Sequence, residues 1–163
     1  MTAGAAGAGR YFPGDWPLPD LSAVNRAFFT AGVLTLQRCR TCSQIQHPPH
    51  ELCHHCQSDT FDYVEASGLG TVDNVTVVHH AGDARLADRV PYNVVIVTPD
   101  DHPDVRIVGN VINADNTAIE IGAPVRCTFA EVADPDTGET LTLPQWQLRQ
   151  RSTSRSAPAT STG

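Results

Sequence analysis

The apolar positions of this chain follow two different periods, and the first of them is helical. Between residues 20 and 32, apolar side chains recur three or four residues apart, at Leu21, Val24, Phe28 and Ala31. Asp20 is a plausible cap before this stripe, and Gly32 stands just past its end. The pattern predicts a short amphipathic helix over residues 20–32. Its apolar stripe could cover either the rest of this chain or another protein.

After the helix the period changes to that of strands. Residues 33–38 form the first extended run, and the runs that follow are rich in Val, Ile and Thr and are separated by Gly and Pro. These later runs are residues 61–66, 69–80, 91–99, 104–113, 123–133 and 139–147. The runs within residues 67–148 amount to about five strands, which predicts a small β-barrel over this part of the chain. The chain is therefore expected to be mainly β.

Length and composition set the frame for these elements. The chain has 163 residues, of which 40% are apolar, so one folded domain or a small domain with an appendage is expected. Residues 1–9 are almost wholly Ala and Gly, and residues 150–163 are small and polar. We therefore predict a flexible arm over residues 1–19 and a disordered tail over residues 149–163.

The charge of the chain argues against nucleic acid as a partner. Acidic residues outnumber basic ones by 18 to 11, which gives a formal net charge of −7. Such a surface repels a phosphate backbone. The sequence has neither a run of about 18 apolar residues nor a secretory leader. The expected location is the cytoplasm, with no membrane contact.

Four of the five cysteines form two Cys-x-x-Cys pairs. Cys39 and Cys42 make the first pair, and Cys53 and Cys56 make the second, with ten residues between the pairs. A two-residue spacing lets a tight turn aim both thiolates at one ion, and two such turns complete the tetrahedral set of zinc. The only large apolar residues between the pairs are Ile45 and Leu52, so burial alone cannot order this segment. Structural Zn²⁺ bound by these four cysteines is the prediction.

Other interpretations of this segment remain open. The pairs could act as redox dithiols or stay unligated, and a four-thiolate site also suits a single iron ion. Four histidines lie in or next to the segment, at His47, His50, His54 and His55, and one of them could replace a sulfur, although they are expected on the surface. A site filled by four thiolates has no open position for water or substrate, so the predicted role is structural and not catalytic.

Two further groups in the sequence are candidates for catalysis. Cys127 alternates with Val125 and Phe129 on one face of a predicted strand, which favours a buried, inert thiol over a nucleophile. His79 and His80 end another strand before Gly82, but no partner for a general base is identifiable nearby. No catalytic residue is predicted.

The order of these motifs resembles a known family. The motifs run as Leu36-Gln37-Arg38-Cys39-x-x-Cys42, Pro48-Pro49, Cys53-x-x-Cys56-x-Ser58, Ser67-Gly68-x-Gly70-Thr71-Val72, Pro91-Tyr92, Gly109-Asn110-Val111, Ile121-Gly122-x-Pro124 and Leu143-Pro144. Over residues 20 to 147 this order is similar to the acyl-CoA-associated family formerly catalogued as domain of unknown function thirty-five. Some positions depart from it: Ser43 and Gln57 replace a common Gly after each pair, His54 replaces Pro, and His50 replaces Arg.

The resemblance implies both a fold and a role. The fold would be an N-terminal helix (20–32), a rubredoxin-like zinc ribbon (33–66) and a five-stranded OB-fold barrel (67–148). The role would be that of a non-catalytic subunit that stabilises a partner enzyme acting on acyl-CoA thioesters and helps to form the acyl-CoA channel, as in lipid or steroid side-chain metabolism. The partner would be a thiolase-fold enzyme (thiolase, acyltransferase or lipid-transfer-protein-like aldolase) or a hydratase.

Two residue sets follow from this expectation. Contacts with CoA phosphates would need cations, for which the candidates are Arg38, Arg40, Arg85, Arg89, Arg106 and Arg126. Docking to the partner would use the apolar stripe and the aromatic residues before it, namely Tyr11, Phe12, Trp16, Leu21, Val24 and Phe28. The alternative functions are a single-stranded nucleic-acid-binding OB-fold and electron transfer through an iron site.

Overall fold

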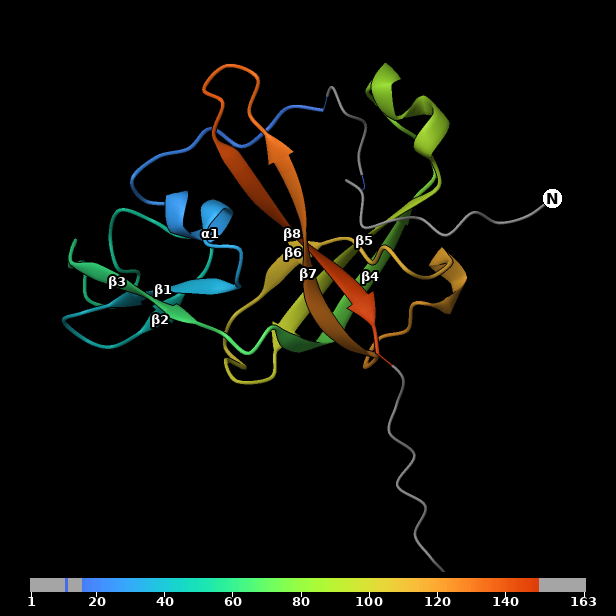
Figure 1. Cartoon of the computed structure of the whole chain (residues 1–163). Helices are drawn as coiled ribbons and strands as arrows, with labels where there is room; N and C mark the ends of the chain where they lie inside the picture. Colours follow the sequence, from blue (N-terminus) through green and yellow to red (C-terminus); the bar gives the residue numbers. More distant parts are fainter. Residues whose placement is uncertain (1–10, 12–15, 150–163) are drawn as a thin grey trace, which may run out of the picture.

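The structure is a computed structural model in which residues 11 and 16–149 are described. These described residues form one short α-helix and eight strands in two sheets (Figure 1). Most of the predicted arm and tail, together with Phe12, lies outside the described residues. Among the helices of the described part, none is long and apolar enough to cross a membrane.

The first sheet carries the cysteine pairs. Strand β1 (Thr35–Cys39) lies between β2 (Ile45–Gln46) and β3 (Phe61–Glu65), and both neighbours are antiparallel to it. Strand β2 is so short that no periodicity in the sequence predicts it. Leu36 and Cys39 lie on opposite faces of β1, and each is fully inaccessible to solvent.

The second sheet has five strands in the order β6-β5-β4-β7-β8, all antiparallel neighbours. Their bounds are β4 Leu69–Val78, β5 Tyr92–Pro99, β6 Ile107–Gly109, β7 Pro124–Ala133 and β8 Thr140–Leu148. A parallel bridge between Val111 and Trp146 joins the two edges of this sheet. This is the expected five-stranded barrel, although the run predicted over residues 104–113 gives only the three-residue strand β6 and the bridge. Two 3₁₀ helices, η1 (Ala84–Arg89) and η2 (Asn116–Ala118), lie in its connections.

A single apolar core joins the two sheets. Phe28 from the helix and Leu34 and Leu36 from the cysteine-bearing unit belong to the same buried cluster as Val97 and Trp146 of the barrel. Burial of this continuous apolar surface is the main favourable term in holding the two units together.

The helix is shorter than its sequence pattern predicts. Helix α1 spans Arg26–Thr30, and the chain before it, from residue 23, forms a turn. Asp20 does not cap it. Instead, the Ser22 N–H donates to Asn25 Oδ1 (2.8 Å) and the Asn25 N–H donates to Ser22 Oγ (3.3 Å), a reciprocal pair of the capping-box kind. Gly32 does follow the helix end, with a φ of 69°.

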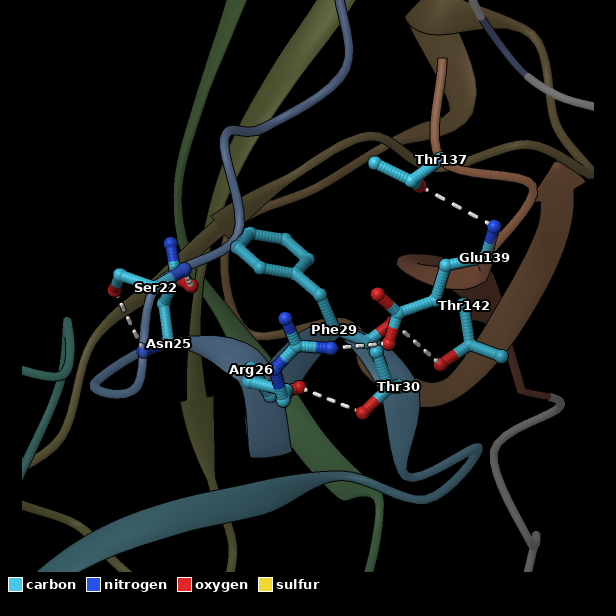
Figure 2. A network of polar contacts seen from close by, with 8 residues as sticks. All are labelled: Ser22, Asn25, Arg26, Phe29, Thr30, Thr137, Glu139 and Thr142. Atoms are coloured by element: carbon cyan, nitrogen blue, oxygen red, sulfur yellow. Dashed lines mark hydrogen bonds and ion pairs between the residues drawn. The ribbon is translucent and has the colours of Figure 1, made fainter. Parts of the chain in front are cut away.

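Side-chain contacts attach this short helix to the β7–β8 hairpin (Figure 2). Arg26 pairs with Glu139, and Thr142 Oγ1 donates to the Phe29 carbonyl oxygen at 3.1 Å. On the other side, Thr35 Oγ1 of β1 donates to the Ala27 carbonyl oxygen at 3.0 Å. A five-residue helix is unstable alone, so these contacts and the burial of Phe28 maintain it.

Candidate functional site

The two cysteine pairs form a pair of matching turns. The Ser43 N–H donates to the Cys39 carbonyl oxygen and the Gln57 N–H donates to the Cys53 carbonyl oxygen, both at 2.9 Å. Each turn is closed by a second bond, from Cys39 N to Gln44 O (2.9 Å) and from Cys53 N to Ser58 O (2.8 Å). These bonds fix the direction in which each pair presents its sulfur atoms.

The four sulfur atoms converge on one point. Cys39 Sγ lies 3.6 Å from Cys56 Sγ, Cys42 Sγ lies 3.6 Å from Cys53 Sγ, and all four lie within 4.8 Å of one another. Bonds of about 2.3 Å to a tetrahedral zinc ion place sulfur atoms about 3.8 Å apart, so this donor set fits zinc. Bound there, zinc would crosslink the two turns, and four thiolates would leave no coordination position for a substrate.

The residues after the two pairs adopt the left-handed conformation. Ser43 has a φ of 63° and Gln57 a φ of 61°, and they are the only non-glycine residues with positive φ in the described part of the chain. Glycine adopts this conformation at no steric cost, which accounts for its being common at both positions in the family that the sequence resembles.

Two buried glutamines position the loop between the pairs. Gln37 Oε1 accepts from Gln46 Nε2 (2.7 Å) and from the His50 N–H (2.9 Å), while Gln37 Nε2 donates to the His50 carbonyl oxygen (2.9 Å). Gln46 Oε1 accepts from the His54 N–H (3.1 Å). Because Gln37 is 1% exposed and Gln46 5%, these bonds are shielded from water and fix the path of the loop.

Three of the four histidines in this region are exposed, as expected. His50 and His54 face each other with ring centroids 5.4 Å apart, and His55 is also on the surface. For His47 the expectation is wrong: its side chain is half-buried and packs against Phe28, with the two ring centroids 4.7 Å apart. Burial lowers the pKa of His47 to about 4, so this imidazole is neutral near pH 7.

The candidate CoA-binding arginines do not form one cluster of free cations. Arg38 makes two hydrogen bonds to Asp62 (2.9 and 2.7 Å), and Arg85 is bound to Asp83 in the same way (3.0 and 2.7 Å). Arg40 lies beside the cysteine site, Arg89 is in η1, and Arg126 is exposed on β7. Arg106 is the remaining candidate and differs in one respect: it lines a cavity.

The predicted docking residues within the described chain contact the protein itself. The Tyr11 hydroxyl accepts from Asn93 N (3.1 Å) and Asn93 Nδ2 (3.0 Å), and the Arg85 guanidinium lies 5.0 Å from the Trp16 ring centroid. Phe28 is 7% exposed and belongs to the core. Leu21 and Val24 are half-buried, and docking through them remains a prediction.

The candidates for catalysis, Cys127, His79 and His80, lie on different parts of the barrel. The Cys127 thiol is packed against the core, and burial raises its pKa to about 12, which removes the thiolate at neutral pH. His79 and His80 are exposed beyond the end of β4. The arrangement is consistent with the prediction of an inert thiol.

The structure adds a cavity that the sequence pattern does not indicate. It has a volume of about 640 Å³ and lies between the segment before α1, α1 itself, the loop at residues 47–49, and strands β5, β6 and β8. Its walls come from segments more than a hundred residues apart, which is why no local motif predicts it. The Pro48-Pro49 and Leu143-Pro144 motifs both meet here.

Comparison with known proteins identifies both units. Residues 29–62 match the rubredoxin-like zinc ribbon domain of ChsH2, and residues 63–130 match the C-terminal OB-fold domain of ChsH2. Together with the convergence of the four sulfur atoms, this match identifies the cysteine site as that of a structural zinc ribbon.

One solved structure is similar over most of the described chain. A chain of the "Ltp2-ChsH2(DUF35) aldolase" superposes with a TM-score of 0.66 at 36% sequence identity. The similarity covers 80% of this chain and 98% of that one.

Several curated proteins are related in sequence. A "Probable enoyl-CoA hydratase alpha subunit" of Thermomonospora curvata is 37% identical over 131 residues, or 78% of this chain. The "3-oxo-4,17-pregnadiene-20-carboxyl-CoA hydratase alpha subunit" of Mycobacterium tuberculosis is 36% identical over 118 residues, or 69% of this chain. This chain spans only 38% and 36% of those two proteins.

A third relative is closer in length. A "DUF35 domain-containing scaffold protein" of Methanocaldococcus jannaschii is 29% identical over 98 residues, which are 60% of this chain and 67% of that protein. The order of ribbon and barrel, the two domain matches and the near-complete overlap with the matched chain of the aldolase agree with one another. The chain belongs to the DUF35 family, with a zinc ribbon and an OB-fold of the ChsH2 type.

Proposed function

We propose that this protein is a non-catalytic accessory subunit of an enzyme complex that acts on acyl-CoA thioesters. The observation that carries the proposal is the similarity to the ChsH2 chain of an aldolase complex, which covers 98% of that chain. Two relatives are named as alpha subunits of CoA-thioester hydratases, and this chain matches little more than a third of each. The matched part is thus a module that occurs beside different catalytic units.

The chemistry of the described residues supports a role without catalysis. The four thiolates at the ribbon fill the coordination sphere of a zinc ion. The remaining thiol, Cys127, has a pKa raised by burial to about 12 and is therefore a poor nucleophile at neutral pH. What the fold does offer is a zinc ribbon and a barrel with an apolar cavity between them.

The partner we propose is a thiolase-fold enzyme, such as a lipid-transfer-protein-like aldolase, or a hydratase. The name of the solved complex supports the first, and the names of the two hydratase subunits support the second. One of those names specifies a pregnadiene carboxyl-CoA, which favours steroid side-chain metabolism as the setting. The chain would stabilise the enzyme and complete the acyl-CoA channel from outside.

Co-expression with the neighbouring genes tests this function. Affinity capture of the chain followed by mass spectrometry is expected to recover an enzyme of acyl-CoA metabolism at a fixed stoichiometry. The isolated chain is expected to show no turnover of acyl-CoA thioesters, because four thiolates fill the zinc site and burial keeps the Cys127 thiol protonated. Turnover by the isolated chain would contradict the proposal. So would the capture of only those enzymes that do not act on CoA thioesters.

A matched pair of variants locates the docking surface. Leu21→Asp alters the predicted apolar stripe, whereas Ile121→Asp alters an exposed apolar residue, 64% accessible, on a connection of the barrel. We expect capture of the partner to fall with Leu21→Asp and to persist with Ile121→Asp. Phe28 is unsuitable for this test because its substitution would disturb the core.

A further inference from the structure

The cavity beside α1 has the size and lining of a small-molecule site. Its volume of about 640 Å³ lies within the range of roughly 300–1,000 Å³ that ligand pockets occupy. Aromatic rings, prolines and aliphatic side chains make up most of its walls, including Phe29, Val108 and Leu143. Its few polar groups include Asn25, His47 and Asn110.

The backbone keeps this cavity open at the point where the barrel closes. The Trp146 N–H donates to the Asn110 carbonyl oxygen at 2.9 Å, so the N–H groups on this side of β8 face the β6 edge. Two residues earlier the same side presents Pro144, which has no N–H to donate. The parallel ladder therefore cannot extend towards Val108, and the two strands stay apart beside the cavity. Val108 is left 66% exposed.

The charge of the walls differs from that of the molecule as a whole. The chain carries a net charge of −7, yet among the residues that the structure describes no Asp or Glu lines this cavity. Arg106 does line it, and its Nε donates to Asp73 (3.1 Å) while its Nη1 donates to the Pro103 and Val105 carbonyl oxygens (2.7 and 3.0 Å). Its Nη2 makes no hydrogen bond within the described residues, so two guanidinium N–H groups remain available.

We propose that this cavity binds the apolar acyl end of a carboxyl compound, with the carboxylate or thioester carbonyl at Arg106. The proposal rests on the proposed function, which supplies the acyl thioester as the compound in question. An apolar lining without carboxylates stabilises a hydrocarbon body, and the free edge of the guanidinium donates to an oxygen at its end. The chain would then bind part of the substrate itself, in addition to shaping a partner's channel.

Binding to the isolated full chain tests the inference. The probe is cis-parinaric acid, a fluorescent long-chain carboxylate, with a steroid carboxylic acid as competitor and free CoA as a control that lacks an acyl group. We expect saturable binding of about one probe per chain, displaced by the steroid acid and not by CoA. Absence of saturable binding, or displacement by CoA alone, would overturn the inference.

Two variants of equal exposure make the test specific. Val108→Asp places a carboxylate at the cavity, while Ile121→Asp places one on a residue that does not line it; the two positions are 66% and 64% exposed. We expect affinity about tenfold weaker in Val108→Asp and unchanged in Ile121→Asp, with zinc content and circular dichroism preserved in both. Equal weakening in both variants would refute a specific site.

The partner experiment separates this inference from the proposed function. If an acyl-CoA enzyme is captured but the isolated chain binds no probe, the proposed function stands and the cavity proposal falls. If Val108→Asp abolishes capture while the wild-type chain never binds the probe, the cavity is part of a protein interface and the proposal falls as well. If the chain binds the probe but captures no enzyme, the cavity proposal stands and the proposed accessory role is contradicted.

Discussion

At the scale of single residues, the zinc ribbon has two positions where a residue with a Cβ adopts a backbone conformation that favours glycine. Ser43 and Gln57 occupy equivalent places after the two cysteine pairs, and both have φ values near 60°. For a residue with a Cβ, this conformation costs about 1–2 kcal/mol. The left-handed turn at these residues directs the chain so that the carbonyl oxygens of Gln44 and Ser58 accept from the N–H groups of Cys39 and Cys53, and the turn geometry is kept in spite of that cost.

Replacing either residue with glycine should stabilise the protein. Glycine removes the left-handed penalty, but it makes the unfolded chain more flexible, which costs about 0.5–1 kcal/mol; Ser43→Gly and Gln57→Gly are therefore each expected to stabilise the protein by about 0.5–1 kcal/mol. Chemical denaturation of the zinc-loaded protein measures this difference. Gln44→Gly is the control, because Gln44 is exposed in the same turn without positive φ and should lose stability. A lower free energy of unfolding in all three variants would show that the conformation of Ser43 and Gln57 is not strained.

At the scale of elements, the closure of the barrel depends on close packing between β6 and β8. A Cβ at Gly109 would lie 2.8 Å from both Cδ1 and Nε1 of Trp146, whose side chain is fully buried. The absence of that atom lets the indole ring fill the gap between the strands. The Val111–Trp146 bridge follows directly after this contact, so the same two segments set the shape of the cavity.

Gly109→Ala should therefore weaken the barrel. Overpacking against a rigid buried ring costs about 1–3 kcal/mol, and the displaced Trp146 side chain should change its fluorescence. Gly82→Ala is the matched control, since nothing lies within 4 Å of its added Cβ and its φ is not positive. Thermal unfolding followed by tryptophan emission compares the two variants. A barrel that tolerates Gly109→Ala as well as Gly82→Ala would mean that the indole can move freely.

At the scale of the whole molecule, zinc and the apolar core stabilise different parts. The core continues from α1 and β1 into the barrel, but the loops that carry Cys42 and Cys56 lie outside it. Between the cysteine pairs, Ile45 only packs against the core from its edge, and Leu52 is 45% exposed. Zinc ribbons of this kind gain on the order of 10–16 kcal/mol from the metal.

Removal of zinc should consequently unfold the ribbon before the barrel. After chelation, hydrogen exchange is expected to lose protection over residues 40–57 and to retain it in β7 and β8. Cys42→Ser should give the same result, with less than one zinc per chain by elemental analysis. Cys127→Ser, which alters the thiol outside the metal site, should keep its zinc. Full protection of the ribbon after complete chelation would rule out a structural role for the metal.

The sequence by itself determined those features whose cause is local. The spacing of Cys39, Cys42, Cys53 and Cys56 was enough to predict the metal site, because a two-residue turn has few geometries. Period-two alternation predicted most strands, since the side chains of a strand alternate between its two faces. The resemblance to the family marked Ser43 and Gln57 as positions where glycine is common, and both have positive φ.

Only the tertiary structure decided the features that depend on distant segments. The helix shortened to Arg26–Thr30 because the chain before it is held by the Ser22–Asn25 pair and its end is set by contacts with Glu139 and Thr142. His47 became half-buried because Phe28 packs against it. The cavity at Pro144 and Arg106 formed where segments remote in sequence meet, and long-range packing of this kind has no signature in any one stretch of residues.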